Sequence, residues 1–287
     1  MITSENFKEY KLLDAGDKEK LESWNGIILR RPDPMAIWPK TKEDLWEKAD
    51  AFYHRSNKGG GYWEYKKKLP ESWNVRYEDL TFKVSPTNFK HTGLFPEQAA
   101  NWDLIMKKVA ERKDASILNL FAYTGAATMA ASKAGAKEVV HLDASKGINE
   151  WAKENMKLSG LQDRTIRFMV DDALKFTARE IRRGRKYDGI IMDPPSYGRG
   201  PDNELFRFED KINPLIENCL QLLSDDPLFF IINTYTTGYS STVMYNTLDV
   251  WCKKKGLQGT IEADEIGIAI DDSPYVLPCG QTTRWYK

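Results

Sequence analysis

The pattern of apolar and polar positions changes about a third of the way along the chain. Up to about residue 88, short alternating runs predict strands at 10–14, 26–30, 75–77 and 80–84. One helical repeat interrupts them, because apolar residues recur at helical spacing from Leu45 to Phe52 after a possible Thr41 cap. We therefore expect residues 1–88 to form a small β-rich α+β domain.

From Phe95 onward, nearly continuous apolar runs alternate with helical segments. The predicted strands are 117–121, 138–142, 166–170, 187–192 and 228–233, and the predicted helices are 126–134, 148–158, 173–182, 212–223 and 242–255. This alternation predicts a parallel sheet with helices on both faces. Segments 260–270 and 283–286 predict a closing hairpin. Residues 89–287 should thus form an α/β domain with a doubly wound, mostly parallel seven-stranded sheet and an antiparallel last strand.

The composition argues against several classes of protein, namely membrane, secreted, disulfide-rich and metal-binding ones. The 287 residues carry 42 Lys and Arg against 42 Asp and Glu. No apolar run approaches the roughly 20 residues of a membrane span, and the N-terminus has no secretory pattern. The three cysteines, Cys219, Cys252 and Cys279, are too widely spaced for a disulfide framework or a metal site. We expect a cytoplasmic protein with no membrane partner and no metal.

Candidate chemistry lies directly after the predicted strands, because ligands of doubly wound sheets bind at the carboxyl ends of the strands. Phe121-Ala-Tyr-Thr-Gly125 follows the first strand of the second domain. Its glycine permits a tight turn, and the next helix offers free N–H groups. A single glycine, with neither a dinucleotide fingerprint nor a phosphate loop, favours a ligand without phosphates, such as S-adenosylmethionine. An ordinary strand–helix turn is an equally good interpretation of this motif alone.

Acidic residues follow the next two strands. Asp143, with Ala144 beside it, is placed to accept hydrogen bonds from ribose hydroxyls, and a helix cap is its alternative role. Asp171 and Asp172 follow the third strand. One of them is expected to accept from an adenine amino group while the other caps the next helix, and the sequence does not distinguish the two.

A proline-rich loop, Asp193-Pro-Pro-Ser-Tyr197, follows the fourth strand. The two prolines lack N–H groups, so the carbonyls stay free to accept hydrogen bonds. Asp193 and the Pro194 carbonyl could hold an amino group, and Tyr197 could stack on a flat base. We predict that Asp193, Pro194, Pro195 and Tyr197 place the substrate and that Asp193 also contacts the cofactor. A rigid loop without chemistry is the alternative.

Taken together, these motifs resemble the class I S-adenosylmethionine-dependent methyltransferases. More narrowly, the chain is similar to a group of large-subunit ribosomal RNA methyltransferases, through Thr92-Gly-Leu-Phe-Pro-Glu-Gln98, Tyr123-Thr-Gly125 and Asp193–Tyr197. The similarity covers about residue 85 to the end, whereas the first 85 residues are organised differently from that group's RNA-binding domain. The resemblance implies S-adenosylmethionine as cofactor and RNA as substrate. It also implies that Thr92 and Gln98 help close a cofactor pocket lined by Phe121, Tyr123 and Gly125.

The methylated atom depends on whether a thiol is available. Methylation of cytosine C5 requires a cysteine thiolate that first adds to C6 of the base. The two positions where such enzymes carry it hold Ser196 and Asn233-Thr-Tyr-Thr-Thr237. A nitrogen target is therefore favoured. Cys279, in the predicted loop of the final hairpin, is the alternative nucleophile, and a protein or small-molecule substrate is a further alternative.

A protein that binds RNA without catalysis is the alternative of a different class. Five tryptophans of the first domain lie among lysines and arginines, which suits base stacking but also a small hydrophobic core. Lys66-Lys-Lys68 is the favoured basic patch. The run Arg179–Lys186 is interpreted as a solvated helix end in preference to an RNA contact. Monomer and homodimer both remain open.

Overall fold

The computed structural model describes residues 1–56, 60–87 and 90–287. They divide into two compact units. The first unit comprises Met1, Asn101–Ile266 and Gly280–Lys287, and the second comprises Ile2–Ala100 and Gly267–Cys279. The predicted domain boundary between residues 88 and 89 lies outside the described residues, so the limits of 1–88 and 89–287 stay a prediction.

The second unit is built on a five-stranded sheet in the order β1-β2-β3-β4-β5. Strands β3 and β4 are parallel, and the other neighbouring pairs are antiparallel. Strands β6 and β7 form a separate antiparallel pair. The elements are β1 Tyr10–Gly16, β2 Glu19–Trp24, β3 Ile27–Pro32, α1 Glu43–Trp46, β4 Ala51–Arg55, β5 Gly61–Tyr65, β6 Trp73–Tyr77, β7 Leu80–Val84 and the 3-10 turn η1 Pro96–Gln98.

Two sequence-based assignments in this unit were wrong. The helical repeat from Leu45 to Phe52 yields only the four-residue helix α1, and Ala51–Arg55 is strand β4. Edge-to-edge pairing of β4 with β3 and β5 outweighs the local periodicity there. Strand β2 was missed because polar residues fill much of it. One of them, Glu22, is buried, and its carboxylate accepts two hydrogen bonds from the guanidinium of Arg31. Arg31 Nε donates at 2.6 Å and Arg31 Nη2 at 2.8 Å.

The tryptophans of this unit serve mainly as packing. Trp24 and Trp46 are buried, and Trp38, Trp63 and Trp73 are half-buried. The indole N–H groups of the half-buried three donate to backbone carbonyls of Ala15, Thr87 and Trp24 respectively. These contacts favour the core interpretation over exposed stacking platforms. Lys66, Lys67 and Lys68 are exposed, as a basic patch requires.

The first unit contains the predicted seven-stranded sheet, in the order β10-β9-β8-β11-β14-β16-β15. The first five strands in this order are parallel, and β16 is antiparallel to β14, which confirms the predicted fold class. The strands are β8 Ser116–Leu120, β9 Glu138–Asp143, β10 Ile166–Val170, β11 Gly189–Met192, β14 Phe229–Thr234, β15 Thr260–Ala269 and β16 Val276–Tyr286.

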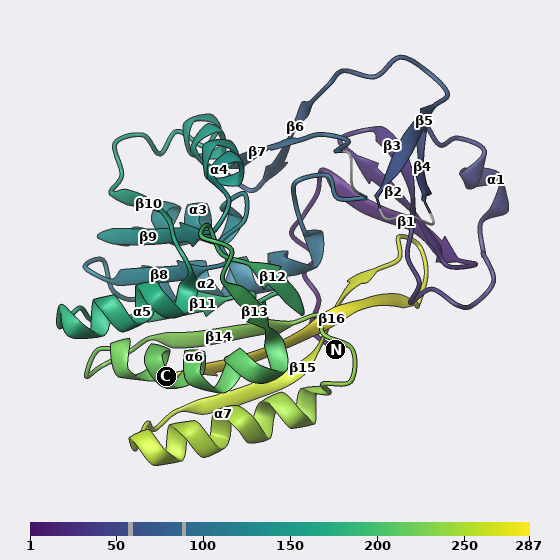
Figure 1. The fold of residues 1–287 in the computed structure, drawn as a ribbon. Coiled ribbons are helices and arrows are strands. Elements are labelled where there is room, and N and C mark those ends of the chain that lie inside the picture. Colours follow the sequence, from purple (N-terminus) through teal and green to yellow (C-terminus); the bar gives the residue numbers. More distant parts are fainter. Residues whose placement is uncertain (57–59, 88–89) are drawn as a thin grey trace. The chain divides into compact units, whose positions relative to one another are not determined.

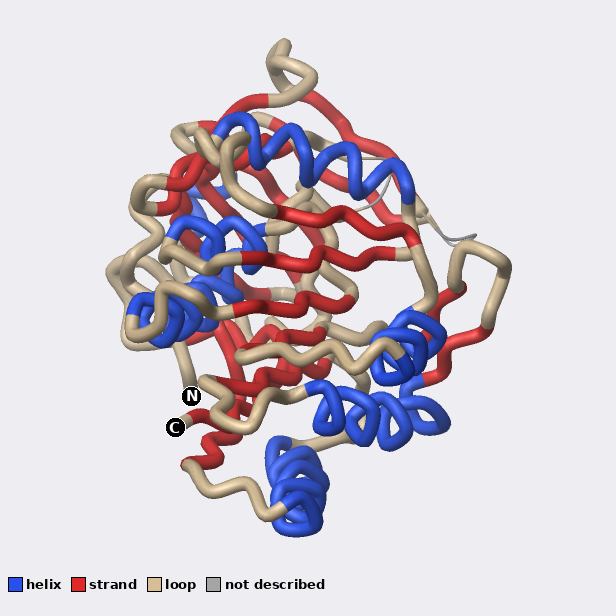
Figure 2. The backbone as a smooth tube through the Cα atoms, turned by 90° about the vertical axis from the view of Figure 1, so that its left-hand side faces the viewer, coloured by secondary structure: helices blue, strands red, loops and turns tan. Residues whose placement is uncertain are grey.

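Helices cover both faces of this sheet (Figures 1 and 2). Helices α5, α6 and α7 follow one another along one face, whereas α3 and α4 pack together on the other (Figure 1). The helices are α2 Ala99–Ala110, α3 Ala126–Lys133, α4 Lys146–Leu158, α5 Ala173–Arg182, α6 Phe208–Leu222 and α7 Ser241–Lys255. In residues 1–56, 60–87 and 90–287, none of these helices has the length and hydropathy to cross a bilayer.

The order of the strands reverses between β8 and β11. From β8 the chain moves outward through β9 to β10, then crosses back to β11 and continues to β14 on the other side. The loops that leave β8 and β11 therefore diverge at their carboxyl ends, which is where doubly wound sheets bind ligands. The Phe121–Gly125 turn and the Asp193–Tyr197 loop are those two loops.

A short hairpin that the sequence patterns did not predict follows the proline loop. Strands β12 Tyr197–Arg199 and β13 Leu205–Arg207 pair in antiparallel fashion. Three residues per strand are too few for a periodic signal. Gly200, Pro201, Asp202 and Asn203, which connect the strands, are nevertheless typical turn residues.

Candidate functional site

The turn after β8 has an unusual backbone. Phe121 and Tyr123 have φ values of 55° and 50°, and Gly125 has a φ of 88°. Left-handed backbone is costly for aromatic residues and recurs at functional sites. The turn is held from both sides, because Ala122 N donates to Leu142 O at 3.0 Å and Asn155 Nδ2 donates to Thr124 O at 2.9 Å. The surrounding contacts thus stabilise a strained loop at the reversal point.

Asp143, at the end of β9, is tied to this turn. Its carboxylate accepts from the backbone N–H of Tyr123 at 3.0 Å and of Ser145 at 2.9 Å. Burial raises the pKa of Asp143, and the two backbone donors oppose that shift. The helix cap of α4 is Ser145, which accepts from Ile148 N, so capping is not the role of Asp143. Its half-buried carboxylate beside the strained turn is suited to hydroxyl donors.

Buried polar side chains that the sequence patterns did not identify support this corner. Asn119 Nδ2 donates to Thr128 Oγ1 at 3.0 Å, and that hydroxyl shares a 2.9 Å hydrogen bond with His141 Nδ1. Burial lowers the pKa of His141 to about 3. Asn149 Nδ2 donates to Met169 O at 3.0 Å and so joins α4 to the end of β10. These polar residues interrupt apolar runs at strand and helix positions, a signal that could have identified them.

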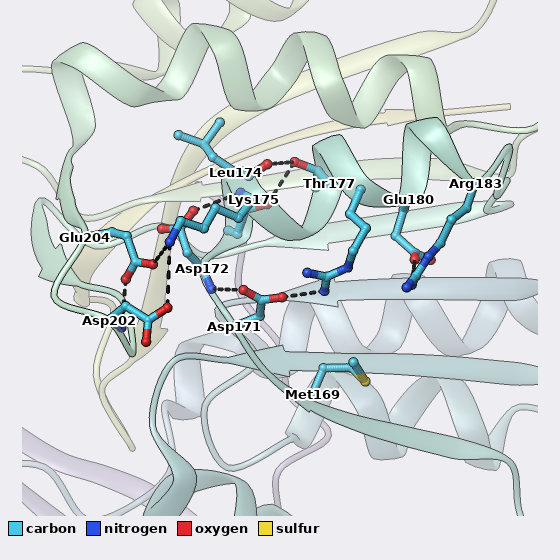
Figure 3. Close-up of polar contacts among 12 residues, drawn as sticks. Met169, Asp171, Asp172, Leu174, Lys175, Thr177, Glu180, Arg183, Asp202 and Glu204 are labelled. Atoms are coloured by element: carbon cyan, nitrogen blue, oxygen red, sulfur yellow. Dashed lines mark hydrogen bonds and ion pairs between the residues drawn. The ribbon is translucent and has the colours of Figure 1, made fainter.

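The two aspartates after β10 have separate roles (Figure 3). Asp172 is the N-cap of α5, and its Oδ1 accepts from Lys175 N at 2.9 Å. Asp171 accepts from Asp172 N at 2.8 Å and pairs with Arg179. A carboxylate has two acceptor oxygens, so the cap leaves Asp172 chemically able to accept from an amino group as well.

Most of the basic run at the end of α5 is engaged within the protein. Arg183 pairs with Glu180 at 3.0 Å, as Figure 3 shows. Arg185 pairs with Glu138 and lies 3.6 Å from Glu180, and Lys186 Nζ donates to Gln221 O at 2.8 Å. These contacts support the interpretation of this run as a structural helix end.

The proline loop brings together the ends of β11 and β14. Pro194 is buried, Asp193 is half-buried, and Pro195, Ser196 and Tyr197 are exposed. Thr236 Oγ1 donates to Ser196 Oγ at 2.9 Å. Ser196 and the segment Asn233–Thr237, the two places expected for a catalytic thiol, therefore meet in space through hydroxyl groups. Tyr197 has 57% of its surface exposed and can offer its ring to a partner.

Cys279 is not in a loop, contrary to expectation. It lies within strand β16, because the final hairpin is longer than predicted and turns before Val276. Its Sγ lies 3.5 Å from Leu277 O, and it packs against the core of the second unit. Burial, followed by the nearby Glu97 carboxylate, raises the pKa of the Cys279 thiol well above its ordinary value. An activated nucleophile requires the opposite shift.

Thr92 and Gln98 lie in the second unit. Thr92 is fully buried and its carbonyl accepts from Ser85 N at 2.9 Å, and Gln98 closes the turn η1. The other predicted cofactor residues, including half-buried Ala144, lie in the first unit. A role for Thr92 and Gln98 in closing the pocket stays a prediction.

The chemistry of the strand ends fits S-adenosylmethionine. Asp143 carries a carboxylate of the kind that accepts from hydroxyls, Asp171 and Asp172 carry carboxylates of the kind that accept from an amino group, and Gly125 is the N-cap of α3 without a side-chain cap. When bound, this cofactor would supply an electrophilic methyl group. Within the described ranges, no group of three or more His, Cys, Asp or Glu side chains is arranged to hold a metal ion.

Comparison with known proteins agrees with this chemistry. Residues 52–218 match the family model for S-adenosylmethionine-dependent methyltransferases. Proteins named ribosomal RNA large subunit methyltransferase are similar in sequence. The K/L protein of Magnetococcus marinus is 26% identical over 80% of this chain, and the K protein of Neisseria meningitidis is 25% identical over 76%. The chain spans 34% and 63% of the lengths of these two relatives.

Solved structures extend the similarity to the whole chain. The crystal structure of a SAM-dependent methyltransferase from Agrobacterium tumefaciens is 33% identical, with a TM-score of 0.93 over 99% of this chain and 92% of that one. A methyltransferase complexed with SAH shares the fold at 18% identity, with a TM-score of 0.74 over 98% of this chain and 76% of that one. With the family model covering more than half of its length, this chain belongs to the S-adenosylmethionine-dependent methyltransferases.

Proposed function

We propose that this protein transfers the methyl group of S-adenosylmethionine to a base of ribosomal RNA, with a ring or exocyclic nitrogen as the acceptor. The observation that carries the proposal is the exposed Tyr197, which follows the rigid Asp193-Pro-Pro segment after one intervening residue, Ser196, at the reversal point of the sheet. An exposed aromatic ring there is suited to stack on an unpaired base. The names of the relatives support RNA as the substrate class.

The cofactor site of this proposal comprises one group at each strand end. Asp143 accepts from the ribose, Asp171 or Asp172 accepts from the adenine amino group, and Asp193 contacts the amino acid part of the cofactor. The residues Thr92, Gln98, Phe121, Tyr123, Gly125 and Ala144 complete the proposed site. Asp193, Pro194, Pro195 and Tyr197 then position the acceptor nitrogen in line with the methyl group, since orientation accounts for most of the rate in such transfers.

The hydroxyl chemistry around the proline loop supports nitrogen over carbon. Ser196 and the segment Asn233–Thr237 occupy the places expected for a thiolate that attacks C6 of cytosine, and Thr236 of that segment bonds to Ser196. The raised pKa of Cys279 gives no support to the alternative thiol. Exocyclic amines need no covalent nucleophile from the protein, and the amine releases one N–H proton, for which Asp193 and the Pro194 carbonyl are the nearby acceptors in this proposal, as it takes the methyl group. A cytoplasmic location belongs to this proposal because ribosomal RNA is the proposed substrate.

The test uses ribosomal RNA from a strain that lacks this gene. The purified protein and methyl-labelled S-adenosylmethionine are added, and the nucleosides are then identified by mass spectrometry. We expect one labelled nucleoside that is methylated at nitrogen and missing from the untreated RNA. A label on cytosine C5 would refute the nitrogen assignment. A second reaction adds the purified protein and the labelled cofactor to a total lysate of the same strain. Label on protein or small molecules there, with none on RNA in either reaction, would refute RNA as the substrate.

A further inference from the structure

The hairpin β12–β13, which begins at Tyr197, has two different faces. In its register Tyr197 lies opposite Arg207, Gly198 opposite Phe206, and Arg199 opposite Leu205. Side chains alternate along a strand, so Tyr197, Arg199, Leu205 and Arg207 share one face. All four are exposed, whereas Phe206 on the other face is buried. We call the exposed face, made of these four residues, the hairpin platform.

The buried face anchors the hairpin to the candidate cofactor site. The ring of Phe206 meets that of Phe121 edge to face, with centroids 5.2 Å apart and an interplanar angle of 67°. Gly198 passes so close to Pro195 that a β-carbon there would lie 3.0 Å from the proline Cγ. The hairpin that carries the platform therefore packs against both the strained turn after β8 and the proline loop.

Charge distinguishes the platform from an ordinary surface hairpin. Its four side chains are two guanidinium groups, a phenol and an aliphatic group, with no carboxylate. The acidic residues of the connecting turn, Asp202 and Glu204, both pair with Lys175 of α5 (Figure 3). Arg199 donates to the amide oxygen of Asn203 at 2.8 Å. Because this amide is neutral, it does not compensate the positive charge of the guanidinium. The result is a basic and aromatic surface beside the place where methyl transfer is proposed.

We infer that the hairpin platform binds the unpaired nucleotides next to the target base. Arg199 and Arg207 contact phosphates, Leu205 packs on a neighbouring base, and Tyr197 forms the end of the platform at the target base. Cations with an exposed aromatic ring fit single strands, since stacking requires a base that is free of its duplex neighbours. The inference rests on the proposed function and names its substrate more narrowly, as a single-stranded loop of RNA.

The test compares two double variants that lose the same charge. R199A/R207A removes both guanidinium groups of the platform. K254A/K255A removes two exposed lysines at the end of α7, which runs back from the carboxyl end of β14 to the opposite edge of the sheet. We expect R199A/R207A to raise KM for ribosomal RNA about tenfold or more. The affinity for S-adenosylmethionine and the melting temperature should match those of K254A/K255A.

Direct binding gives a readout independent of methyl transfer. A labelled single-stranded 12-nucleotide RNA is titrated at several salt concentrations, with its duplex as comparison. The slope of log K against log salt should fall by about 0.7 per lost phosphate contact in R199A/R207A, and R199K/R207K should restore most of it. Equal slopes and equal KM in the two alanine variants would overturn the inference. If the wild type methylates no RNA, the proposed function fails, and this binding comparison still decides on the platform.

Discussion

At the scale of single residues, the site is defined by polar groups placed where apolar ones would be expected. Asp143 is half-buried, receives two backbone N–H groups and leaves the capping of α4 to Ser145. His141 is fully buried two residues before the end of the same strand. Both residues carry a cost of burial that is visible in their shifted pKa values. Such costs recur where a protein holds a ligand.

Asp143→Ala should weaken the binding of S-adenosylmethionine by about tenfold or more, because each hydrogen bond from a ligand to a charged acceptor contributes about 1.5–3 kcal/mol. Isothermal titration calorimetry measures the change directly. Asp163→Ala, at an exposed aspartate before β10, is the matched control. Equal affinities in the two variants would disprove the assignment of Asp143 to the ribose.

His141 should make the protein sensitive to acid. Its pKa of about 3 in the folded state lies below the ordinary 6.5, so the unfolded chain binds the proton more tightly. The free energy of unfolding therefore falls as the pH drops from 6.5 towards 3, by about 2 kcal/mol at pH 5 from this group. His141→Asn keeps an acceptor near Nδ1 and removes the titration. Urea denaturation at pH 7.5 and pH 5 measures how much the free energy of unfolding falls between the two pH values. That decrease should be smaller in the variant than in the wild type, by about the same 2 kcal/mol. An unchanged difference would contradict the prediction.

At the scale of elements, the site depends on how strands end and helices begin. The apolar runs predicted the central strands within a few residues, because a strand buried on both faces must be apolar throughout. Short elements were less predictable. The helix α1 was overestimated, and β2 and the hairpin β12–β13 were missed, because pairing with neighbouring strands decides their structure. The hairpin matters most, since its packing of Phe206 on Phe121 joins the substrate loop to the turn after β8.

The start of α5 allows the two roles of Asp172 to be separated. Asp172→Ser retains a capping oxygen for Lys175 N and should leave stability within about 0.5 kcal/mol, whereas Asp172→Ala should cost about 1 kcal/mol. If Asp172 also accepts from adenine, both variants should bind S-adenosylmethionine about tenfold more weakly. Calorimetry and urea denaturation separate the two effects. A serine variant with wild-type affinity would assign the adenine contact to Asp171 instead.

At the scale of the whole molecule, the chain passes between its two units several times. Gly267–Cys279 belongs with the N-terminal unit although it lies near the other end of the sequence. There Ile270 and Leu277 join Leu12, Ala15 and Ala36 in one buried cluster. No local sequence pattern reports such a long-range return of the chain to the N-terminal unit.

A fragment of residues 2–100 should therefore lack cooperative folding. It loses the burial of Ile270 and Leu277, each contributing about 1.5–3 kcal/mol, from a unit small enough to be marginal. Thermal denaturation followed by circular dichroism, together with binding of a hydrophobic dye, measures this. Joining residues 267–279 to the fragment through a Gly/Ser linker should restore a cooperative transition. A fragment that melts cooperatively without that segment would show that the cluster is dispensable.

The sequence by itself determined the alternation of strands and helices and the motifs after four strands, because these depend on local periodicity and on residue type. It therefore predicted a methyltransferase fold, which family membership confirms. Only the tertiary structure decided which groups meet: Asp143 with the turn at Tyr123, Ser196 with Thr236, and the ring of Phe206 with that of Phe121. It also placed Cys279 in a strand with a raised thiol pKa. The physical reason is that burial and long-range pairing depend on residues far apart in the chain, which no local pattern contains.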